Sequence, residues 1–303
     1  VAQLAQQPVD RVPRGISAAA FARLREQAAM QLQTRETGKL AWRIRDKGVD
    51  YRSRGLALLP PPSRLDVFYD IEGFPYAEDG LEYLHGATTI EPDGALRFHD
   101  WWAHDEASEK RAFEQFVDWA WQRWQEDPAM HIYHYAGYER TALSRLSIKY
   151  ASREFEIDQF LRSGVLVDLF TVVRQGMVIG APSYSLKEIE KLYLAPREGD
   201  VVSASGSVVE YQRWIDSGES SDWRESPILS AIRDYNRVDC ESTAHLRDWL
   251  LERQREAEWH WQPLDTGDES TDAVERERGP RELLADQLTA RAVSLDGEEQ
   301  RVT

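Results

Sequence analysis

Apolar residues follow two different periods along the chain, and these periods divide it into strands and helices. Five short stretches are rich in β-branched and aromatic residues and are bounded by Pro, Gly or Asp, which is typical of strands. They span residues 67–71, 81–90, 95–103, 131–135 and 165–169. Elsewhere apolar residues recur every three or four positions, which predicts helices. These span residues 17–33, 106–125, 138–150, 154–162, 208–215 and 226–259.

Turn and cap residues fix the ends of several elements. Pro92-Asp93-Gly94 is a strong hairpin signal between two strands. Asp105 is placed to cap the helix that follows, and Ser226 is placed before Pro227 to cap the last long helix. Ser185 with Glu188 has the spacing of a capping box. The order of the elements predicts an α/β fold, with a mixed five-stranded sheet and helices on both faces.

Composition indicates one large domain with extensions. The chain has 303 residues, 42% of them hydrophobic, which is enough for a sizeable core. We expect the main domain at residues 62–260, preceded by an N-terminal helical segment, residues 1–61. Residues 261–303 are acidic and poor in aromatics, so they are interpreted as a linker or tail. The chain begins with Val and not Met, which indicates a piece cut from a longer protein.

Charge and cysteine content narrow the class of protein. The single cysteine, Cys240, excludes an internal disulfide framework and fits a reducing compartment. No run of eighteen apolar residues is present, so we predict a cytoplasmic protein without membrane contact. The net charge of −16 argues against a broad basic surface that grips nucleic acid. It does not argue against a metal-dependent nuclease, because bound cations attract phosphate locally.

The first strand carries the first candidate site. Because side chains alternate along a strand, Asp70 and Glu72 lie on one face, and Tyr69 and Ile71 on the other. Two adjacent carboxylates repel each other, and paired hard oxygen ligands suit Mg²⁺ or Mn²⁺. The alternative is that these acids only mark where the strand meets water.

Two further stretches carry acids in unusual positions. Glu139 lies in the first turn of a helix, where it could be a ligand or simply an acid that complements the helix dipole. Tyr235 and Asp239 are four residues apart and share one helix face. Asp is a poor residue for a helix interior, so an inward-facing Asp239 requires a cation or a donor.

Together these stretches resemble the RNase H-like 3′–5′ exonucleases of the four-carboxylate (DEDD) superfamily, in their tyrosine branch. Asp70-Ile-Glu72 matches the first motif and Tyr235-x-x-x-Asp239 the third. The second motif is matched by Tyr135-Ala-Gly-Tyr-Glu139, with Glu where Asp is usual and Tyr where Asn is usual. This departure leaves the metal geometry at Glu139 open.

A closer resemblance, over about residues 64–252, is to the YprB-type domain of RecB-like nuclease–helicase proteins. Four runs carry it: Asp70-Ile-Glu-Gly-Phe-Pro75, Tyr133-His-Tyr-Ala-Gly-Tyr-Glu139, Val167-Asp-Leu169 and Tyr184-Ser-Leu-Lys-Glu-Ile-Glu190. The resemblance implies a RecB-like domain before this chain and a helicase after it, both in cis. It also implies an RNase H-like sheet and a nucleic-acid substrate, a single-stranded end of DNA or RNA.

The resemblance implies two ions, Mg²⁺ or Mn²⁺, and a role for each site residue. Asp70 would bridge the ions, Glu72 and Asp239 would each complete one, and Glu139 would act directly or through water. Tyr235 would orient the attacking water. Three residues are assigned to the substrate: Gly73, Phe74 and Tyr135.

Two assignments and the activity itself have alternatives. Phe74 could stack on a base or be an ordinary core aromatic. Asp168, at a strand end, could belong to the site or could cap the helix at Phe170. The predicted function is metal-dependent 3′–5′ exonuclease activity. The alternative is an inactive nucleic-acid-binding or coupling module, favoured by Glu139 in place of Asp and by the acidic net charge.

Overall fold

A five-stranded mixed sheet lies at the centre of the computed structural model, which describes residues 1–48, 51–195 and 204–261. The strand order is β4-β3-β2-β5-β6. The bounds are Val67–Phe74 for β2, Leu81–Ile90 for β3, Leu96–Trp102 for β4, Ile132–His134 for β5 and Leu166–Asp168 for β6. β2 is antiparallel to β3 and parallel to β5, so it lies at the junction of the two halves. The predicted α/β fold with five strands is confirmed.

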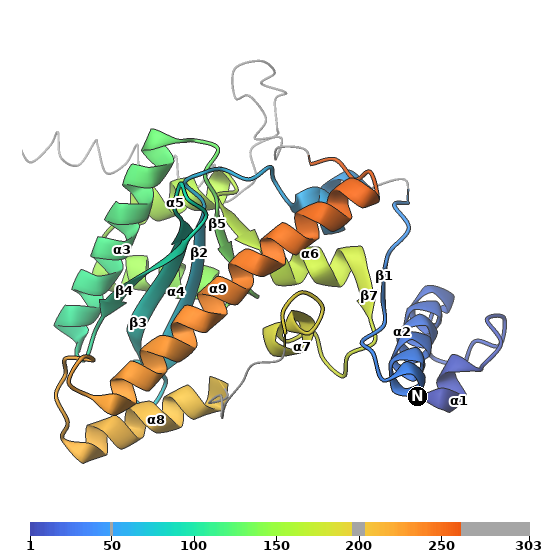
Figure 1. Cartoon of the computed structure of the whole chain (residues 1–303), viewed down its shortest axis with the longest axis horizontal. Coiled ribbons are helices and arrows are strands. Elements are labelled where there is room, and N and C mark those ends of the chain that lie inside the picture. The colour runs from blue at the N-terminus through green and yellow to red at the C-terminus, as the bar shows by residue number, and fades with distance from the viewer. Residues whose placement is uncertain (49–50, 196–203, 262–303) are drawn as a thin grey trace, which may run out of the picture. The chain divides into compact units, whose positions relative to one another are not determined.

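Helices cover both faces of this sheet (Figure 1). On one face lie α3 (Glu106–Glu126), α4 (Tyr138–Tyr150) and α5 (Glu154–Arg162), packed on β2 through Tyr69 and Ile71. On the other lie α6 (Leu169–Gly176) and the long α9 (Pro227–Glu256), packed on Phe68. A third apolar cluster joins the end of β2 to α8 (Ala204–Ser217) through Phe74 and Tyr211. The alternation of β2 side chains between two covered faces is as predicted.

Most of the predicted helix caps are present. Asp105 accepts a hydrogen bond from the Ser108 amide at 2.7 Å, and Ser226 accepts one from Leu229. The capping box at Ser185 is wrong. Ser185 precedes α7 (Leu186–Glu190), but its side chain makes no capping hydrogen bond and instead accepts one from Ser183.

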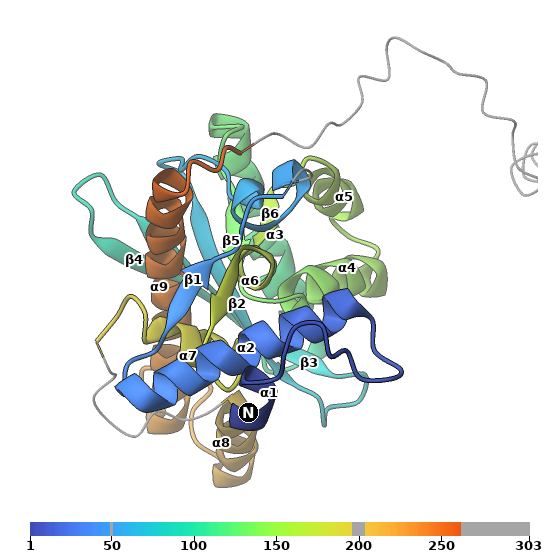
Figure 2. The same ribbon diagram turned by 90° about the vertical axis from the view of Figure 1, so that its right-hand side faces the viewer.

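The N-terminal segment is built into the same compact unit as the sheet. Its helix α2 (Ala18–Thr37) extends four residues beyond the predicted end. Sequence reasoning missed a second sheet, in which β1 (Trp42–Ile44) pairs antiparallel with β7 (Met177–Ile179). Three short elements were also missed: α1 (Ala2–Ala5), η1 (Tyr51–Ser53) and η2 (Gly55–Leu58). Figure 2 shows α2 lying across the front of this region.

A buried ion pair fixes α9 against the start of β2. Arg247 on α9 donates to Asp66 at 2.5 Å, and both side chains are almost completely buried. Burial raises the pKa of Asp66 to about 6, opposed by the charge of Arg247. The guanidinium also lies over the Phe68 ring, 4.8 Å from its centroid. These contacts set the register of α9, and Asp239 lies about two turns before Arg247.

None of the helices described is both long and apolar enough to cross a membrane. Almost all of the predicted tail, residues 261–303, lies outside the described residues.

Candidate active site

Strand β2 presents two carboxylates to the long helix α9. Asp70 is half-buried and Glu72 is 7% exposed. Burial raises the pKa of Asp70 well above its usual value, and the charges of Glu72, Asp239 and Glu139 raise it further. Burial also raises the pKa of Glu72, to about 8. Carboxylates from β2, α4 and α9 therefore face one another closely enough for each to disfavour the charge on Asp70.

Helix α9 adds a tyrosine to this cluster. The Tyr235 side chain is 8% exposed, and its hydroxyl hydrogen-bonds to Asp239 one turn later. Burial, followed by the charges of Asp239 and Glu72, raises the pKa of Tyr235 above its usual value. The phenol therefore stays protonated, and it faces the carboxylates as a neutral donor.

Asn236, the residue after Tyr235, joins α9 to both carboxylates of β2. Its side chain is completely buried, and Nδ2 donates to Asp70 Oδ2 at 2.7 Å. A hydrogen bond from Asn236 also lowers the pKa of Glu72, against the effect of burial. The amide is accommodated because Gly86, opposite Asp70 on β3, has no side chain. A Cβ at Gly86 would lie 2.8 Å from Asn236 Cγ.

Glu139 reaches the site from the first turn of α4. Its side chain is 3% exposed, and Oε2 is buried without a hydrogen-bond partner. His134 Nδ1 lies 3.4 Å from Oε2, but that nitrogen hydrogen-bonds with the Ala136 carbonyl at 2.6 Å. A buried carboxylate oxygen without a donor is costly unless another group neutralises it.

Asp168 shapes that same turn. Its Oδ1 accepts hydrogen bonds from the amides of Phe170 and Ala136, each at 2.9 Å, and its Oδ2 accepts one from Thr171. The hydrogen bond from the Phe170 amide caps α6, as the alternative interpretation of Asp168 predicted. The hydrogen bond from the Ala136 amide holds Ala136 at φ 77°, in the left-handed region. It therefore fixes the backbone three residues before Glu139.

Comparison with known proteins gives the family. The family model described as the RNase H superfamily matches residues 67–251, from the start of β2 into the last turns of α9. The chain belongs to the RNase H superfamily. The predicted RNase H-like sheet, with helices on both faces, is confirmed, and membership indicates a nuclease-type activity. Neither the curated proteins nor the solved structures gave a match.

RNase H-like nucleases generally use divalent metal ions, and the cluster has the chemistry to hold them. In residues 1–48, 51–195 and 204–261, no three His, Cys, Asp or Glu side chains stand in a metal-binding arrangement. The donor set nevertheless fits a hard divalent cation, because it consists of carboxylates that repel one another. The unpartnered Oε2 of Glu139 also fits such an ion. In this conformation the amide of Asn236 hydrogen-bonds to both Asp70 and Glu72, and Ser207 also hydrogen-bonds to Glu72.

The residues predicted to bind substrate are packed within the protein. Phe74 is 5% exposed and packs beside Tyr211, which favours its interpretation as a core aromatic. Tyr135 is half-buried, and its hydroxyl donates to the Tyr184 carbonyl. Gly73 gives room to its neighbours, since a Cβ there would lie 2.5 Å from Glu82 Oε2.

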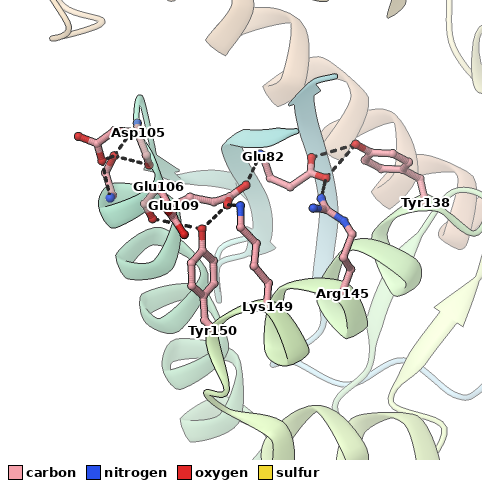
Figure 3. A network of polar contacts seen from close by, with 9 residues as sticks. Glu82, Asp105, Glu106, Glu109, Tyr138, Arg145, Lys149 and Tyr150 are labelled. Carbon is pink, nitrogen blue, oxygen red and sulfur yellow. Dashed lines mark hydrogen bonds and ion pairs between the residues drawn. The ribbon is translucent and has the colours of Figure 1, made fainter. Parts of the chain in front are cut away.

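A polar network adjoins the site on the side of Gly73 (Figure 3). Glu82 on β3 is buried, accepts a hydrogen bond from Tyr138 at 2.9 Å and pairs with Arg145 on α4. Glu109 on α3 is also buried; it pairs with Lys149 at 2.7 Å and accepts a hydrogen bond from the Glu82 amide at 2.5 Å. These ion pairs and hydrogen bonds tie α3 and α4 to β3, and the hydrogen bond to Glu82 holds Tyr138, next to Glu139, in place.

Three residues at the site were not predicted from the sequence: Asn236, Ser207 and Lys187. Ser207 on α8 hydrogen-bonds to Glu72, and Lys187 on α7 lies over the Tyr235 ring. Asn236 falls inside the Tyr235–Asp239 motif, so its place beside the carboxylates could have been inferred from helix spacing. Ser207 carries no such signal. Lys187 lies in the run from Tyr184 to Glu190 that carries the family resemblance, but its spacing gave it no role, because only folding brings α7 to α9 and α8 to β2.

Proposed function

We propose that this chain hydrolyses the phosphodiester bonds of DNA or RNA as a 3′–5′ exonuclease that uses two ions, Mg²⁺ or Mn²⁺. The observation that carries the proposal is that three other carboxylates, from β2, α4 and α9, lie near enough to Asp70 to raise its pKa, and that the protonated Tyr235 hydrogen-bonds to one of them. Membership of the RNase H superfamily supports the nuclease activity. The direction of cleavage rests on the resemblance of Asp70-Ile-Glu72 and Tyr235-x-x-x-Asp239 to the tyrosine branch.

Each carboxylate has a role that follows from its position. Asp70 would hold the ions together with Glu72 and Asp239, the carboxylates whose charges raise its pKa. Glu139, whose Oε2 is unpartnered, would contribute directly or through a water. When bound, the ions would stabilise charge on the phosphate and lower the pKa of a water molecule.

Tyr235 orients the attacking water in this proposal. Its hydroxyl donates to Asp239, which leaves the phenol oxygen free to accept a hydrogen bond from water. Because its pKa is raised, Tyr235 acts as a positioning group and not as the base. The water oxygen attacks phosphorus as the bond to the 3′ oxygen breaks. The products are a nucleoside 5′-monophosphate and a strand one residue shorter, with a free 3′ hydroxyl.

The test is cleavage of 5′-labelled single-stranded DNA and RNA with Mn²⁺, Mg²⁺ or EDTA. We expect stepwise shortening from the 3′ end with either metal, and none in EDTA or with Asp70→Asn. A 3′-blocked strand should resist cleavage, which separates exonuclease from endonuclease action. Equal cleavage by the wild type and Asp70→Asn would place the activity elsewhere.

A second candidate is a non-catalytic nucleic-acid-binding module, coupled to the RecB-like and helicase domains that the YprB resemblance implies. The observation that favours it is the contact of Glu139 with His134, together with the lack of a preformed ligand arrangement in the described residues. This candidate predicts that the wild type binds single strands and leaves them intact with Mn²⁺. It also predicts that Tyr235→Phe leaves binding unchanged.

A further inference from the structure

A lysine on α7 lies against the proposed active site. Lys187 is half-buried, and its Nζ lies 4.8 Å from the centroid of the Tyr235 ring. Its charge also lowers the pKa of Glu72, which burial raises. Lys187 is therefore a cation on the side of the cluster that Tyr235 and Glu72 share.

The short helix that carries Lys187 is firmly held. Ile189 is completely buried in the core beside α9. Glu190 is 5% exposed and accepts a hydrogen bond from Ser242 on α9 at 3.1 Å. These two contacts lie within one turn of Lys187, so the Cα of Lys187 is fixed relative to the helix that bears Tyr235 and Asp239.

Phosphodiester hydrolysis gives such a cation a specific task. As water attacks and the leaving oxygen departs, negative charge gathers on the non-bridging oxygens of the phosphate. An ammonium group carries three rotatable N–H donors on a flexible stem and can follow those oxygens as the geometry changes. We propose that Lys187 is a further catalytic residue, whose ammonium donates to a non-bridging oxygen of the scissile phosphate beside Tyr235. This inference rests on the proposed nuclease function and deepens it.

The same chain supplies matched variants. Lys187→Met keeps the length and the apolar stem but removes the charge, and Lys187→Arg keeps the charge. Lys191→Met is the control: Lys191 lies one turn along, its side chain is 55% exposed, and it pairs with Glu188. Both Met variants have the same net charge, so a difference between them reports position and not overall charge.

Single-turnover cleavage of a 5′-labelled single strand with Mn²⁺ is the first measurement. We expect Lys187→Met to lower the rate about 10²–10³-fold, the range for loss of one positioned donor to a charged transition state. Lys187→Arg should stay within about tenfold of the wild type, and Lys191→Met should match it. The Mn²⁺-induced rise in melting temperature should be the same in all four proteins, because Lys187 is not a metal ligand. A rate for Lys187→Met equal to that of Lys191→Met would overturn the inference, as would loss of the Mn²⁺ response.

Equilibrium binding separates this inference from the proposed function. A fluorescent oligonucleotide with hydrolysis-resistant phosphorothioate linkages at its 3′ end, in the presence of Mn²⁺, measures affinity without cleavage. We expect Lys187→Met to bind it about tenfold more weakly than Lys191→Met, which corresponds to loss of one charge-assisted hydrogen bond. If the wild type cleaves no strand under any condition, the proposed nuclease function is refuted. The comparison of affinities then tests separately whether Lys187 contacts phosphate. Equal affinities of the two Met variants would refute the contact with phosphate.

Discussion

Replacing Gly86 by Ala should break the contact between α9 and β2 that organises the carboxylates. A Cβ at Gly86 would overlap the Asn236 amide oxygen and lie 2.8 Å from Asn236 Cγ and 3.0 Å from Phe98 Cε2. Side-chain atoms do not approach a Cβ closer than 3.0 Å, so the amide must rotate away. That movement removes the 2.7 Å hydrogen bond to Asp70.

The size of the effect follows from two contributions. Inserting a methyl group into a filled space costs about 1–3 kcal/mol. Loss of a hydrogen bond that leaves a buried polar group without a partner costs about 1–3 kcal/mol. The two overlap, because one movement of Asn236 relieves the clash and breaks the bond. We therefore expect Gly86→Ala to lower the free energy of unfolding by about 2–4 kcal/mol in EDTA.

Urea denaturation in EDTA measures this loss, and two comparisons test its cause. Gly137→Ala is the matched control, because a Cβ at Gly137 has no atom within 4 Å and the residue has an ordinary negative φ of −97°. In an Asn236→Ala background the clash with Asn236 is gone and only the 3.0 Å contact with Phe98 remains, so Gly86→Ala should cost about 1 kcal/mol or less. The double-mutant cycle should therefore show strong coupling. Additive effects of the two substitutions would refute the reasoning.

The other predictions concern charge and catalysis. In EDTA the folded protein favours protonated Asp70 and Glu72, so the stability that these two groups contribute should be fully present below the ordinary carboxyl pKa and should be lost as the pH rises through about 8. Asp70→Asn should lessen that loss and abolish the rise in melting temperature that Mn²⁺ produces; equal metal responses would show that the ions bind elsewhere. Tyr235→Phe should slow cleavage about 10²–10⁴-fold with unchanged substrate affinity in single-turnover assays, and a change confined to affinity would contradict its role in orienting water. Glu139→Asp should alter the rate or the metal preference if Glu139 is a ligand, whereas identical Mn²⁺ and Mg²⁺ profiles would make it a helix-terminal acid only.

The sequence was sufficient to predict features that depend only on residues close to one another along the chain. Strand alternation alone places Asp70 and Glu72 on the face opposite Tyr69 and Ile71, as found in the core clusters. Helix spacing alone places Tyr235 and Asp239 on one face, since residues four apart are neighbours. The Asp105 and Ser226 caps were predicted for the same reason, because each acts within three residues of itself.

Local reasoning was insufficient where a residue has two possible partners. Ser185 has the spacing of a capping box, yet its hydroxyl accepts a hydrogen bond from Ser183. Phe74 has the composition of a stacking platform, yet its ring is buried beside Tyr211 from α8, more than a hundred residues later. The β1–β7 pairing was missed because each strand has three residues and is stabilised only by its distant partner.

The sequence by itself determined the order along the chain of the five central strands and the long helices, the faces of β2 and α9, and which acids are candidates for the site. Only the tertiary structure decided what surrounds those acids. The amide of Asn236 reaches Asp70 because Gly86 leaves room for it on the neighbouring strand. Lys187 reaches Tyr235 because Ile189 and Glu190 dock α7 on the core and on α9. Periodicity along a chain specifies the face of a strand or helix on which each side chain lies. Which distant segments lie next to that face depends on how their side chains pack.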